Sequence, residues 1–436
     1  MWEDLHWIDP SSLEVLTLVL QQVPTSRALV VLTYRPDFTP PWRPRAHSTQ
    51  LTLSRLGQQH VTAMVNQVMA KAVLSVEVVQ QIVSRTDGIP LFVEELTKSV
   101  AEAVGVTGRS PLQLAIPTTL HDSLMARLDR LGAAKTIAQL GATLGREFRY
   151  ELLQAVAPVD VTALQQALQQ LVDAELLYQR GLPPQATYLF KHALIQDAAY
   201  QSLLKSTRQQ YHQQIAQQLE EQFPEAKETQ PELVAHHYTE AGLIGQAIPY
   251  WQRAGQKASQ RSANSEAINY LLKGLELLKT LPNTPERAQQ ELLLQTAIGP
   301  ALIVTKGLVA PEVGKAYARA RELCQQVEET LQLFPVLRGL SLFYAGRAEH
   351  TTARELSEQC LHLVQHTQDP ALLLEAHYIM GNNLFYLGEF APAREHFERS
   401  LALYDSRQHR SHAFLDRKST RLNSSHIQKS RMPSSA

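Results

Sequence analysis

Cysteine is almost missing from this chain of 436 residues, and long apolar runs are missing altogether. The two cysteines, Cys324 and Cys360, cannot form a disulfide framework or a zinc site, and their scarcity fits a reducing compartment. No apolar run approaches the roughly 18 residues that a membrane span needs. The acidic residues Glu3 and Asp4 oppose a signal or transit peptide. We therefore expect a cytoplasmic protein of roughly three domains without a membrane segment.

Strong net charge is also missing, since the formal net charge is −1. This balance hides an asymmetry. Residues 407–436 hold seven Lys or Arg and one Asp, which leaves 34 basic and 41 acidic residues elsewhere. An acidic body argues against a nucleic-acid surface, so nucleic acid is not an expected partner. The Ser-rich, basic residues 416–436 lack apolar periodicity and are expected to be a disordered or artefactual tail, with a natural basic tail as the alternative.

The chain also lacks a phosphate-binding loop of the form G-x-x-x-x-G-K-[ST]. Yet Glu3-Asp4 is typical of the acidic pair at the end of a Walker B strand. In proteins with such a strand, the phosphate-binding loop comes earlier in the chain. Ala28 to Thr33 is an apolar run typical of a parallel strand that is buried on both faces. These features predict that the sequence starts inside a nucleotide-binding domain. An acid cluster that caps the helix at Pro10 is the alternative for the acidic pair.

Helical periodicity dominates the following residues. Three apolar stripes predict a helical lid, with a stop at Asp87-Gly88 and a new start at Pro90; the stripes contain Val61, Met64, Val65, Val68, Met69, Val76, Val79, Ile82, Val83, Val93, Leu96 and Val100. Residues 111–205 combine helices with a turn-rich spacer between two short apolar runs. Helices followed by such a hairpin are typical of a winged helix.

A repeat occupies the last part of the chain. Ala-Arg-Glu recurs at 320–322, 353–355 and 393–395. The residues around the last copy are close to a tetratricopeptide helix pair of about 34 residues. Small residues around an aromatic one, as in Ala247, Trp251 and Ala254, let neighbouring helices pack closely. We therefore expect residues 206–415 to form a tetratricopeptide-like α-solenoid with a concave surface for a protein partner.

Three motifs occur in an order that resembles one family, the signal-transduction ATPases with numerous domains (STAND). Within this family the chain most resembles a group of bacterial predicted ATPases that are often fused to nucleotidyl cyclase or protein kinase domains. They are Glu3-Asp4-Leu5-His6-Trp7-Ile8-Asp9, Thr33-Tyr34-Arg35-Pro36-Asp37 and Gly88-Ile89-Pro90-Leu91-Phe92-Val93-Glu94-Glu95-Leu96. The resemblance covers residues 1–415. It implies a mostly α protein with a truncated P-loop α/β domain and helical lid over residues 1–110, a winged helix over 111–205, and the helical repeats.

The resemblance also implies roles for the acidic pair and for Arg35. Glu3 would hold Mg²⁺ through water, and Asp4 would activate the water that attacks ATP. Arg35 would sense the γ-phosphate from the carboxyl end of its strand. An arginine that only satisfies loop carbonyls is the alternative for Arg35.

Gly88, Pro90 and His192 are the other residues with an implied role in binding ATP or ADP. Gly88 and Pro90 match a motif that offers an apolar surface to adenine, with ordinary helix punctuation as the alternative. His192 matches a histidine that contacts the ADP phosphate, although the aspartate of that motif is Ala193 here. A core or surface histidine is the alternative.

The predicted function is a regulatory switch that ATP and ADP control, acting through homo-oligomerisation or a fused effector. Because the phosphate loop supplies most of the hold on the phosphates, we expect this chain alone to be inactive. The first alternative is a non-catalytic tetratricopeptide scaffold for protein–protein interaction. The second is a MalT-like transcriptional regulator fragment; such activators end in a helix-turn-helix, and the sequence shows no such pattern.

Overall fold

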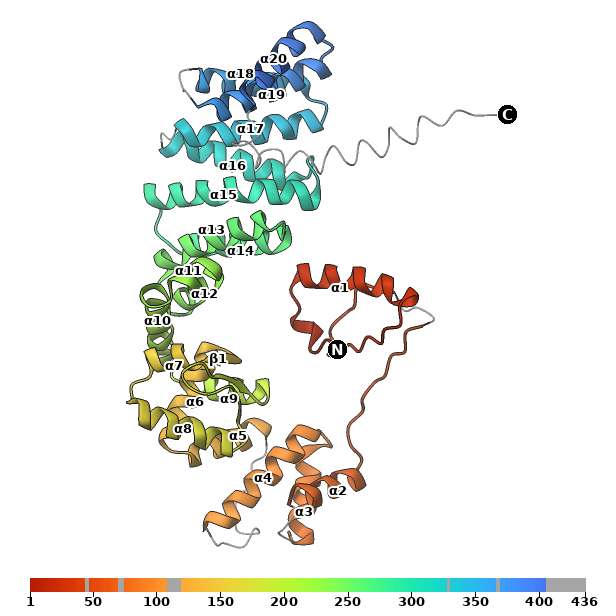
Figure 1. Ribbon diagram of the computed structural model, residues 1–436, viewed down its shortest axis with the longest axis vertical. Coiled ribbons are helices and arrows are strands. Elements are labelled where there is room, and N and C mark those ends of the chain that lie inside the picture. The colour runs from red at the N-terminus through yellow and green to blue at the C-terminus, as the bar shows by residue number, and fades with distance from the viewer. Residues whose placement is uncertain (44–46, 70–73, 108–118, 328–329, 366–368, 405–436) are drawn as a thin grey trace, which may run out of the picture. The chain divides into compact units, whose positions relative to one another are not determined.

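The structure, a computed structural model, describes residues 1–436 except 44–46, 70–73, 108–118, 328–329, 366–368 and 405–436 (Figure 1). The described chain is mostly helical. It divides into two compact units: unit 1 is Met1–Ile8 with Val15–Tyr250, and unit 2 is Asp9–Glu14 with Trp251–Ala436. The predicted domain boundaries at 110 and 205 lie inside unit 1 and stay predictions. The predicted tail, 416–436, lies outside the described residues. No helix among the described residues is both long and apolar enough to cross a membrane.

The N-terminal segment holds two short 3₁₀ helices, η1 (Leu5–Trp7) and η2 (Val23–Thr25), on either side of the longer helix α1 (Pro10–Gln22). The helix start is as predicted, because the Ser12 N–H donates to Asp9 Oδ1 at 2.8 Å. The predicted strand is wrong in its burial. Only Leu32 forms a bridge, in parallel with Trp2, and Leu29 is 88% exposed. Residues 28–33 form no named strand; Ala28, Leu29 and Val31 are exposed, and Val30 and Leu32 are half-buried.

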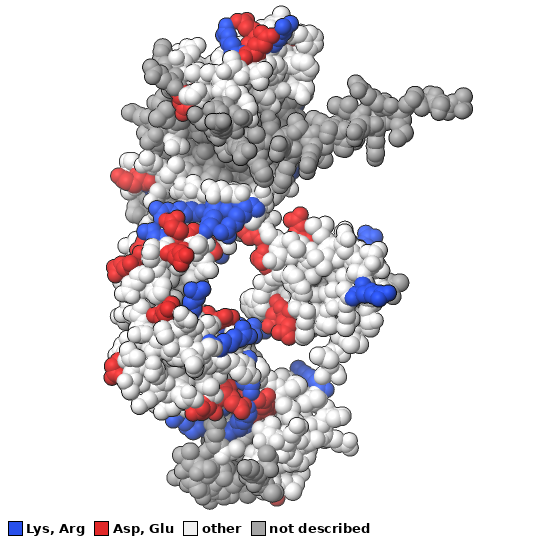
Figure 2. Space-filling view, viewed as in Figure 1, with Lys and Arg blue, Asp and Glu red and all other residues white. Residues whose placement is uncertain are grey.

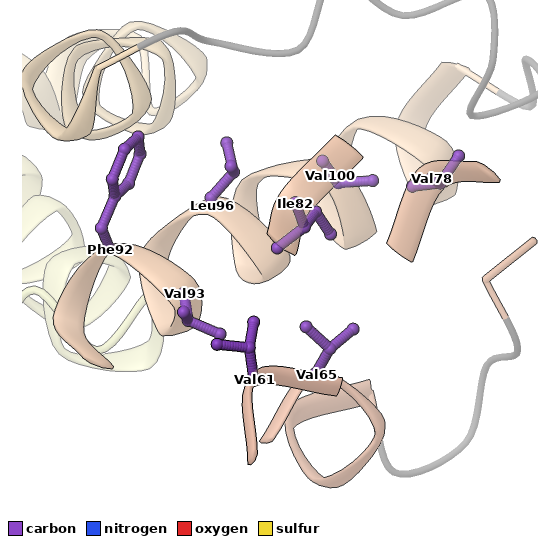
Figure 3. Close-up of a cluster of buried hydrophobic side chains, with 8 residues drawn as sticks. All are labelled: Val61, Val65, Val78, Ile82, Phe92, Val93, Leu96 and Val100. Carbon is purple, nitrogen blue, oxygen red and sulfur yellow. The ribbon is translucent and has the colours of Figure 1, made fainter. Parts of the chain in front are cut away.

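Helices α2 (Gln58–Met69), α3 (Val76–Thr86) and α4 (Pro90–Thr107) form the region predicted to be a helical lid, and α4 is called the lid helix below. Their buried apolar side chains form one cluster, in which Val93 of α4 points toward Val61 of α2 (Figure 3); its members are Val61, Val65, Val78, Ile82, Phe92, Val93, Leu96 and Val100. The predicted stripes are confirmed at most positions. Val76 is an exception: as the first residue of α3 it is exposed, and Val78 takes the core position.

Five helices and a small sheet follow, with bounds α5 (Leu120–Arg130), α6 (Ala133–Leu144), α7 (Tyr150–Val156), α8 (Val161–Asp173) and α9 (Ala193–Gln201). The predicted hairpin is confirmed: β2 (Leu177–Arg180) pairs antiparallel with β3 (Thr187–Phe190). A third strand, β1 (Glu147–Arg149), pairs with the other edge of β3. Phe148, Tyr188 and Phe190 lie buried on one side of this sheet.

Eleven helices follow among the described residues; in unit 1, α10 packs against α11 and α12, and in unit 2 each helix from α14 to α20 packs against the next along the chain. They are α10 (Lys205–Glu221), α11 (Pro224–Thr229), α12 (Pro231–Glu240), α13 (Ile244–Gln260), α14 (Asn264–Leu278), α15 (Pro285–Lys306), α16 (Pro311–Val327), α17 (Thr330–Gly346), α18 (His350–Val364), α19 (Pro370–Tyr386) and α20 (Phe390–Leu403). The α17–α18 pair and the α19–α20 pair begin 40 residues apart, which confirms the interval of the last two Ala-Arg-Glu copies. Helices α14 to α20 of unit 2 form a solenoid-like array.

Close helix packing in unit 2 depends on small residues. The Tyr317 ring of α16 is almost fully buried between Gly299 of α15 and Gly339 of α17. A Cβ atom at either glycine would lie 2.3 Å from this ring, far inside van der Waals contact. Burial also raises the pKa of Tyr317 to about 12. These glycines are therefore needed for the space they leave free.

Candidate functional site

The acidic pair lies where two chain segments run in parallel. The Trp2 N–H donates to the Val31 carbonyl at 2.8 Å, and the Thr33 N–H donates to the Trp2 carbonyl at 3.0 Å. The Asp4 N–H donates to Thr33 Oγ1 at 3.0 Å. Asp4 has a φ of 56°, in the left-handed region that few residues other than glycine adopt. The pairing therefore holds Asp4 in an unusual backbone conformation at the end of the short strand.

Arg35 follows the second of these parallel segments by two residues. Since Trp2 pairs with Leu32, the parallel register places Glu3, Asp4 and Arg35 at the same carboxyl edge. All three side chains are exposed. The Asp4 carboxylate lies 3.4 Å from the Arg146 guanidinium, and both side chains are about half exposed.

The exposed carboxylates of Glu3 and Asp4 fit an ion that is held through water, because water can reach both. A direct metal site is a different matter. Among the described residues, no group of three or more His, Cys, Asp or Glu side chains could hold a metal ion. The Mg²⁺ role of Glu3 stays a prediction.

Gly88 and Pro90 form the junction between α3 and α4. Asp87 ends α3 in the left-handed region, and Gly88 follows with a φ of +69°. The Leu56 N–H donates to the Gly88 carbonyl at 2.8 Å, and a Cβ atom on Gly88 would lie 2.2 Å from the Leu56 carbonyl oxygen. Pro90 is the first residue of α4 and is exposed. The predicted end of one helix and start of the next are thus confirmed here, and a role of these residues in binding a nucleotide stays a prediction.

His192 precedes α9 and is half-buried. Its Nε2 atom is buried and has no hydrogen-bond partner. Burial lowers the pKa of His192, and the nearby carboxylate of Glu95 opposes this effect. Burial therefore favours the neutral form of the ring, and its Nε2 atom is left without a hydrogen-bond partner.

A buried ion pair joins the lid helix α4 to α5. Glu95 of α4 pairs with Arg127 of α5, and both side chains are almost fully buried. Arg127 also donates to the Ala174 carbonyl at 2.6 Å. The second Glu95 oxygen, Oε1, has no partner. Breaking such a pair from one side would leave a buried charge uncompensated, which is strongly destabilising.

A second, more exposed group of charges surrounds the same junction. The Lys191 ammonium lies 3.0 Å from Glu94 of α4 and 3.1 Å from Glu175, and Lys98 pairs with both of these acids. Hydrogen bonds from Lys98 and Lys191 lower the pKa of Glu175 to about 2. The two sequence motifs, Glu94-Glu95 on the lid and Lys191-His192 before α9, therefore meet in one cluster.

The structure thus groups the predicted residues in two places. Glu3, Asp4 and Arg35 lie at one strand edge, and His192 lies beside the lid helix that Gly88 and Pro90 begin. Among the described residues, no hydrogen bond or ion pair joins one group to the other. Sequence reasoning missed Arg127 and Lys191 as partners of the lid, because each lies tens of residues from the acid it pairs with and no local charge pattern marks it.

The chain matches no protein-family model. It is 28% identical over 415 residues to an uncharacterized protein from Rhizobium meliloti (strain 1021), a match that covers 93% of this chain and 40% of that protein. The chain therefore spans well under half the length of this relative.

Two solved structures share a partial likeness with the chain. One is a STAND protein with a tetratricopeptide repeat sensor from Pyrococcus horikoshii, with a TM-score of 0.32 and 10% identity over 85% of this chain and 57% of that one. The other is BtubC from P. vanneervenii, with a TM-score of 0.32 and 11% identity over 64% of this chain and 90% of that one. TM-scores this low do not establish a common fold.

Proposed function

We propose that this chain is part of a STAND-type regulatory ATPase. In this view it carries the acidic edge of a nucleotide-binding domain, a helical lid, a winged helix over the region of β1 to β3, and tetratricopeptide-like repeats that bind a protein partner. ATP and ADP would set the state of the switch. The signal would pass to a fused effector or to further copies of the chain.

The observation that supports this proposal best is the parallel pairing of residues 2–5 with 31–33. In open α/β sheets, ligands bind outside the carboxyl ends of the strands. The isolated parallel bridge between Trp2 and Leu32, which Glu3, Asp4 and Arg35 follow with exposed side chains, supports such a position for these three residues. The order and identity of the three motifs agree with this arrangement.

Each residue at this edge has a distinct task in the proposal. Bound Mg²⁺ would neutralise phosphate charge. Glu3 would accept hydrogen bonds from the waters of that ion, and Asp4 would orient and deprotonate the water that attacks the terminal phosphate. Arg35 would place a positive charge near the same phosphate.

The lid junction supports a role in transmitting the nucleotide state. The lid helix α4 begins at the Gly88-Ile89-Pro90 motif and reaches Glu94 and Glu95, which pair with Lys191 and Arg127 of the following region. A change at the start of this helix would therefore act directly on its ion pairs with that region.

A pure interaction scaffold is the second candidate. The stack of helices supports it, since most of the described chain lies in helices of the kind that repeat proteins use to bind partners. It would require no nucleotide. The two candidates differ in whether the acidic edge has any function.

The test uses the product of the reading frame that contains this sequence together with the residues encoded before Met1. We expect MgATP binding and slow hydrolysis, and at least about a hundredfold lower kcat in Asp4→Asn with little change in ATP affinity, since general-base catalysis contributes about 10²–10⁴-fold. Glu14→Gln, an exposed acid on α1, is the matched control. A product that ignores ATP would leave the scaffold as the function.

A further inference from the structure

The outer face of α20 carries an apolar groove of about 400 Å³. Phe385 at the end of α19 and Phe390, Phe397 and Leu401 of α20 line it. The rings of Phe385 and Phe390 lie 5.5 Å apart. Leu401 is 72% exposed, and Phe385 and Phe390 are at least half exposed. So many exposed large apolar side chains on one face are typical of an interaction surface.

The preceding repeat shows what covers the corresponding face of α18. Because the two helix pairs begin 40 residues apart, Leu361 of α18 is the counterpart of Leu401 of α20. Leu361 is covered: it packs against Met380, Leu384 and Ala393 of the next helix pair. The same position on α20 has no helix over it among the described residues. The internal repeat therefore predicts a helix like α19 as the occupant.

The charges at the rim follow the same repeat. Arg354 of α18 pairs with Glu358 on its own helix at 2.9 Å and also reaches Glu389, which follows α19, at 2.8 Å. Its counterpart Arg394 pairs with Glu398 at 2.6 Å, and its side chain is 81% exposed. Acidic and basic side chains lie side by side at the α20 end of unit 2 (Figure 2). A carboxylate on the occupant, placed as Glu389 is, would complete the second ion pair of Arg394.

The interior of the groove differs from its counterpart in polarity. Between α17 and α18, Asn383 of α19 donates to Ser341 Oγ at 2.9 Å and to Ser357 Oγ at 2.7 Å. The counterparts of these two serines are Gly381 and Phe397, and the Phe397 ring fills the space beside the glycine. An amide side chain at the Asn383-equivalent position would therefore find no hydroxyl group to which it could donate a hydrogen bond. The occupant must therefore carry an apolar residue where α19 carries Asn383.

We propose that this α20 groove binds an amphipathic helix of a partner protein, packed as α19 packs on α18. The helix presents a continuous apolar stripe to Phe397 and Leu401, with an apolar side chain at the Asn383-equivalent position. An acidic residue in the turn after the helix pairs with Arg394. The inference deepens the protein-binding part of the proposed function and involves no nucleotide.

The probe is a labelled synthetic peptide of residues 370–389 that carries Asn383→Leu, titrated against the full chain without nucleotide and followed by fluorescence anisotropy. We expect it to bind about tenfold more tightly than the unmodified peptide, because an unpaired buried amide costs about 1–3 kcal/mol. Leu401→Asp in the protein should weaken binding at least tenfold. Leu272→Asp, at an exposed position on α14, should not.

A charge swap tests the rim independently of the apolar contact. Arg394→Glu should weaken binding severalfold, and a peptide with Glu389→Lys should restore it. No binding up to millimolar peptide, or equal binding by the wild type and Leu401→Asp, overturns the proposal. A dimer of the chain that Leu401→Asp dissociates would assign the groove to a second copy and would overturn it as well. Because no nucleotide is present, these results do not depend on the ATPase assay.

Discussion

The N-terminal segment, residues 1–43, and the helical array of unit 2 both contain many leucine and valine side chains, but they bury them to different extents. Leu29 is 88% exposed and Val31 is 41% exposed, whereas Leu292 and Leu294 of α15 are fully buried. Leu5 and Leu16 are the only fully buried large apolar side chains of the described N-terminal segment. Apolar sequence alone therefore did not decide burial in this molecule.

The difference follows from where each element finds its neighbours. A repeat helix packs against the helices that precede and follow it in the chain, so local sequence supplies its core. A parallel strand instead needs partners that lie far away along the chain, and both its faces need helices. The segment around Leu32 has one paired neighbour, at Trp2, among the described residues. Such an edge leaves apolar surface for another element to cover.

The largest expected effect comes from a substitution in the helical array of unit 2, the well-buried member of this comparison. Tyr317→Ala should lower the free energy of unfolding by about 3–5 kcal/mol, because it empties the space between Gly299 and Gly339. Urea denaturation of unit 2, followed by circular dichroism, measures the loss. Tyr386→Ala, at a ring that is 60% exposed, should cost less than about 1 kcal/mol. Equal losses in the two variants would contradict the packing described for Tyr317.

A pH series extends the comparison to the helices upstream of unit 2. His212 of α10 and His237 of α12 are buried and joined through their Nδ1 atoms at 2.8 Å. Burial, and then the charge of His236, lowers the pKa of His212 to about 4 from an ordinary value of 6.5. Between these two values the unfolded chain binds a proton that the folded chain does not, so stability is lost as pH falls.

The expected loss between pH 6.5 and pH 4 is about 3 kcal/mol, since one pKa unit corresponds to about 1.4 kcal/mol. Urea midpoints at these two pH values measure it. The double variant His212→Gln with His237→Gln should flatten this dependence. An unchanged pH slope in the double variant would show that other groups cause the loss.

A substitution at the start of the lid helix should have an effect of intermediate size on the free energy of unfolding. Gly88→Ala should cost about 2 kcal/mol or more, because the left-handed backbone alone costs about 1–2 kcal/mol and the new Cβ would also meet the Leu56 carbonyl. Gly388→Ala is the matched control: its φ is +81°, but no atom lies within 4 Å of the Cβ that it would gain. Thermal unfolding should rank Gly88→Ala as the more destabilising change. The reverse order would contradict the contact with Leu56.

The smallest expected effect lies on the N-terminal side. Leu29→Ser should change the free energy of unfolding by no more than about 0.5 kcal/mol, because its side chain already faces solvent. Urea denaturation of the same 436-residue chain measures it. A loss of 2 kcal/mol or more would mean that Leu29 is covered in solution.

Local signals in the sequence predicted much of the helical fold. The stop at Asp87-Gly88, the start at Pro90 and the 40-residue interval each depend on residues close together in the chain, and the structure confirms all three. Strand β1 went unpredicted because it has three residues and pairs with β3, about 40 residues later. The burial of the strand near Leu32 was wrong because apolar composition does not reveal whether partners are present.

The candidate site was predictable only in part. Glu3, Asp4 and Arg35 were predicted from their motifs, and they follow the two segments that the Trp2–Leu32 bridge joins, but their roles stay predictions. The Glu95–Arg127 ion pair could not be predicted, since 32 residues separate its members and either could have faced solvent. The role of His192 was predicted from its motif and stays a prediction, and its position beside the charges of the lid helix depends on how α4 and α9 pack.

The central claim is that Glu3 and Asp4 serve a bound magnesium nucleotide. Equilibrium binding of a fluorescent ATP analogue with Mg²⁺ tests it most directly, in the reading-frame product that includes the residues encoded before Met1. The account predicts saturable binding there, with a Mg²⁺ dependence that Glu3→Gln weakens, and little or no binding by the 436-residue chain alone. Tight Mg²⁺-dependent binding by the 436-residue chain, or none by the longer product, would contradict it.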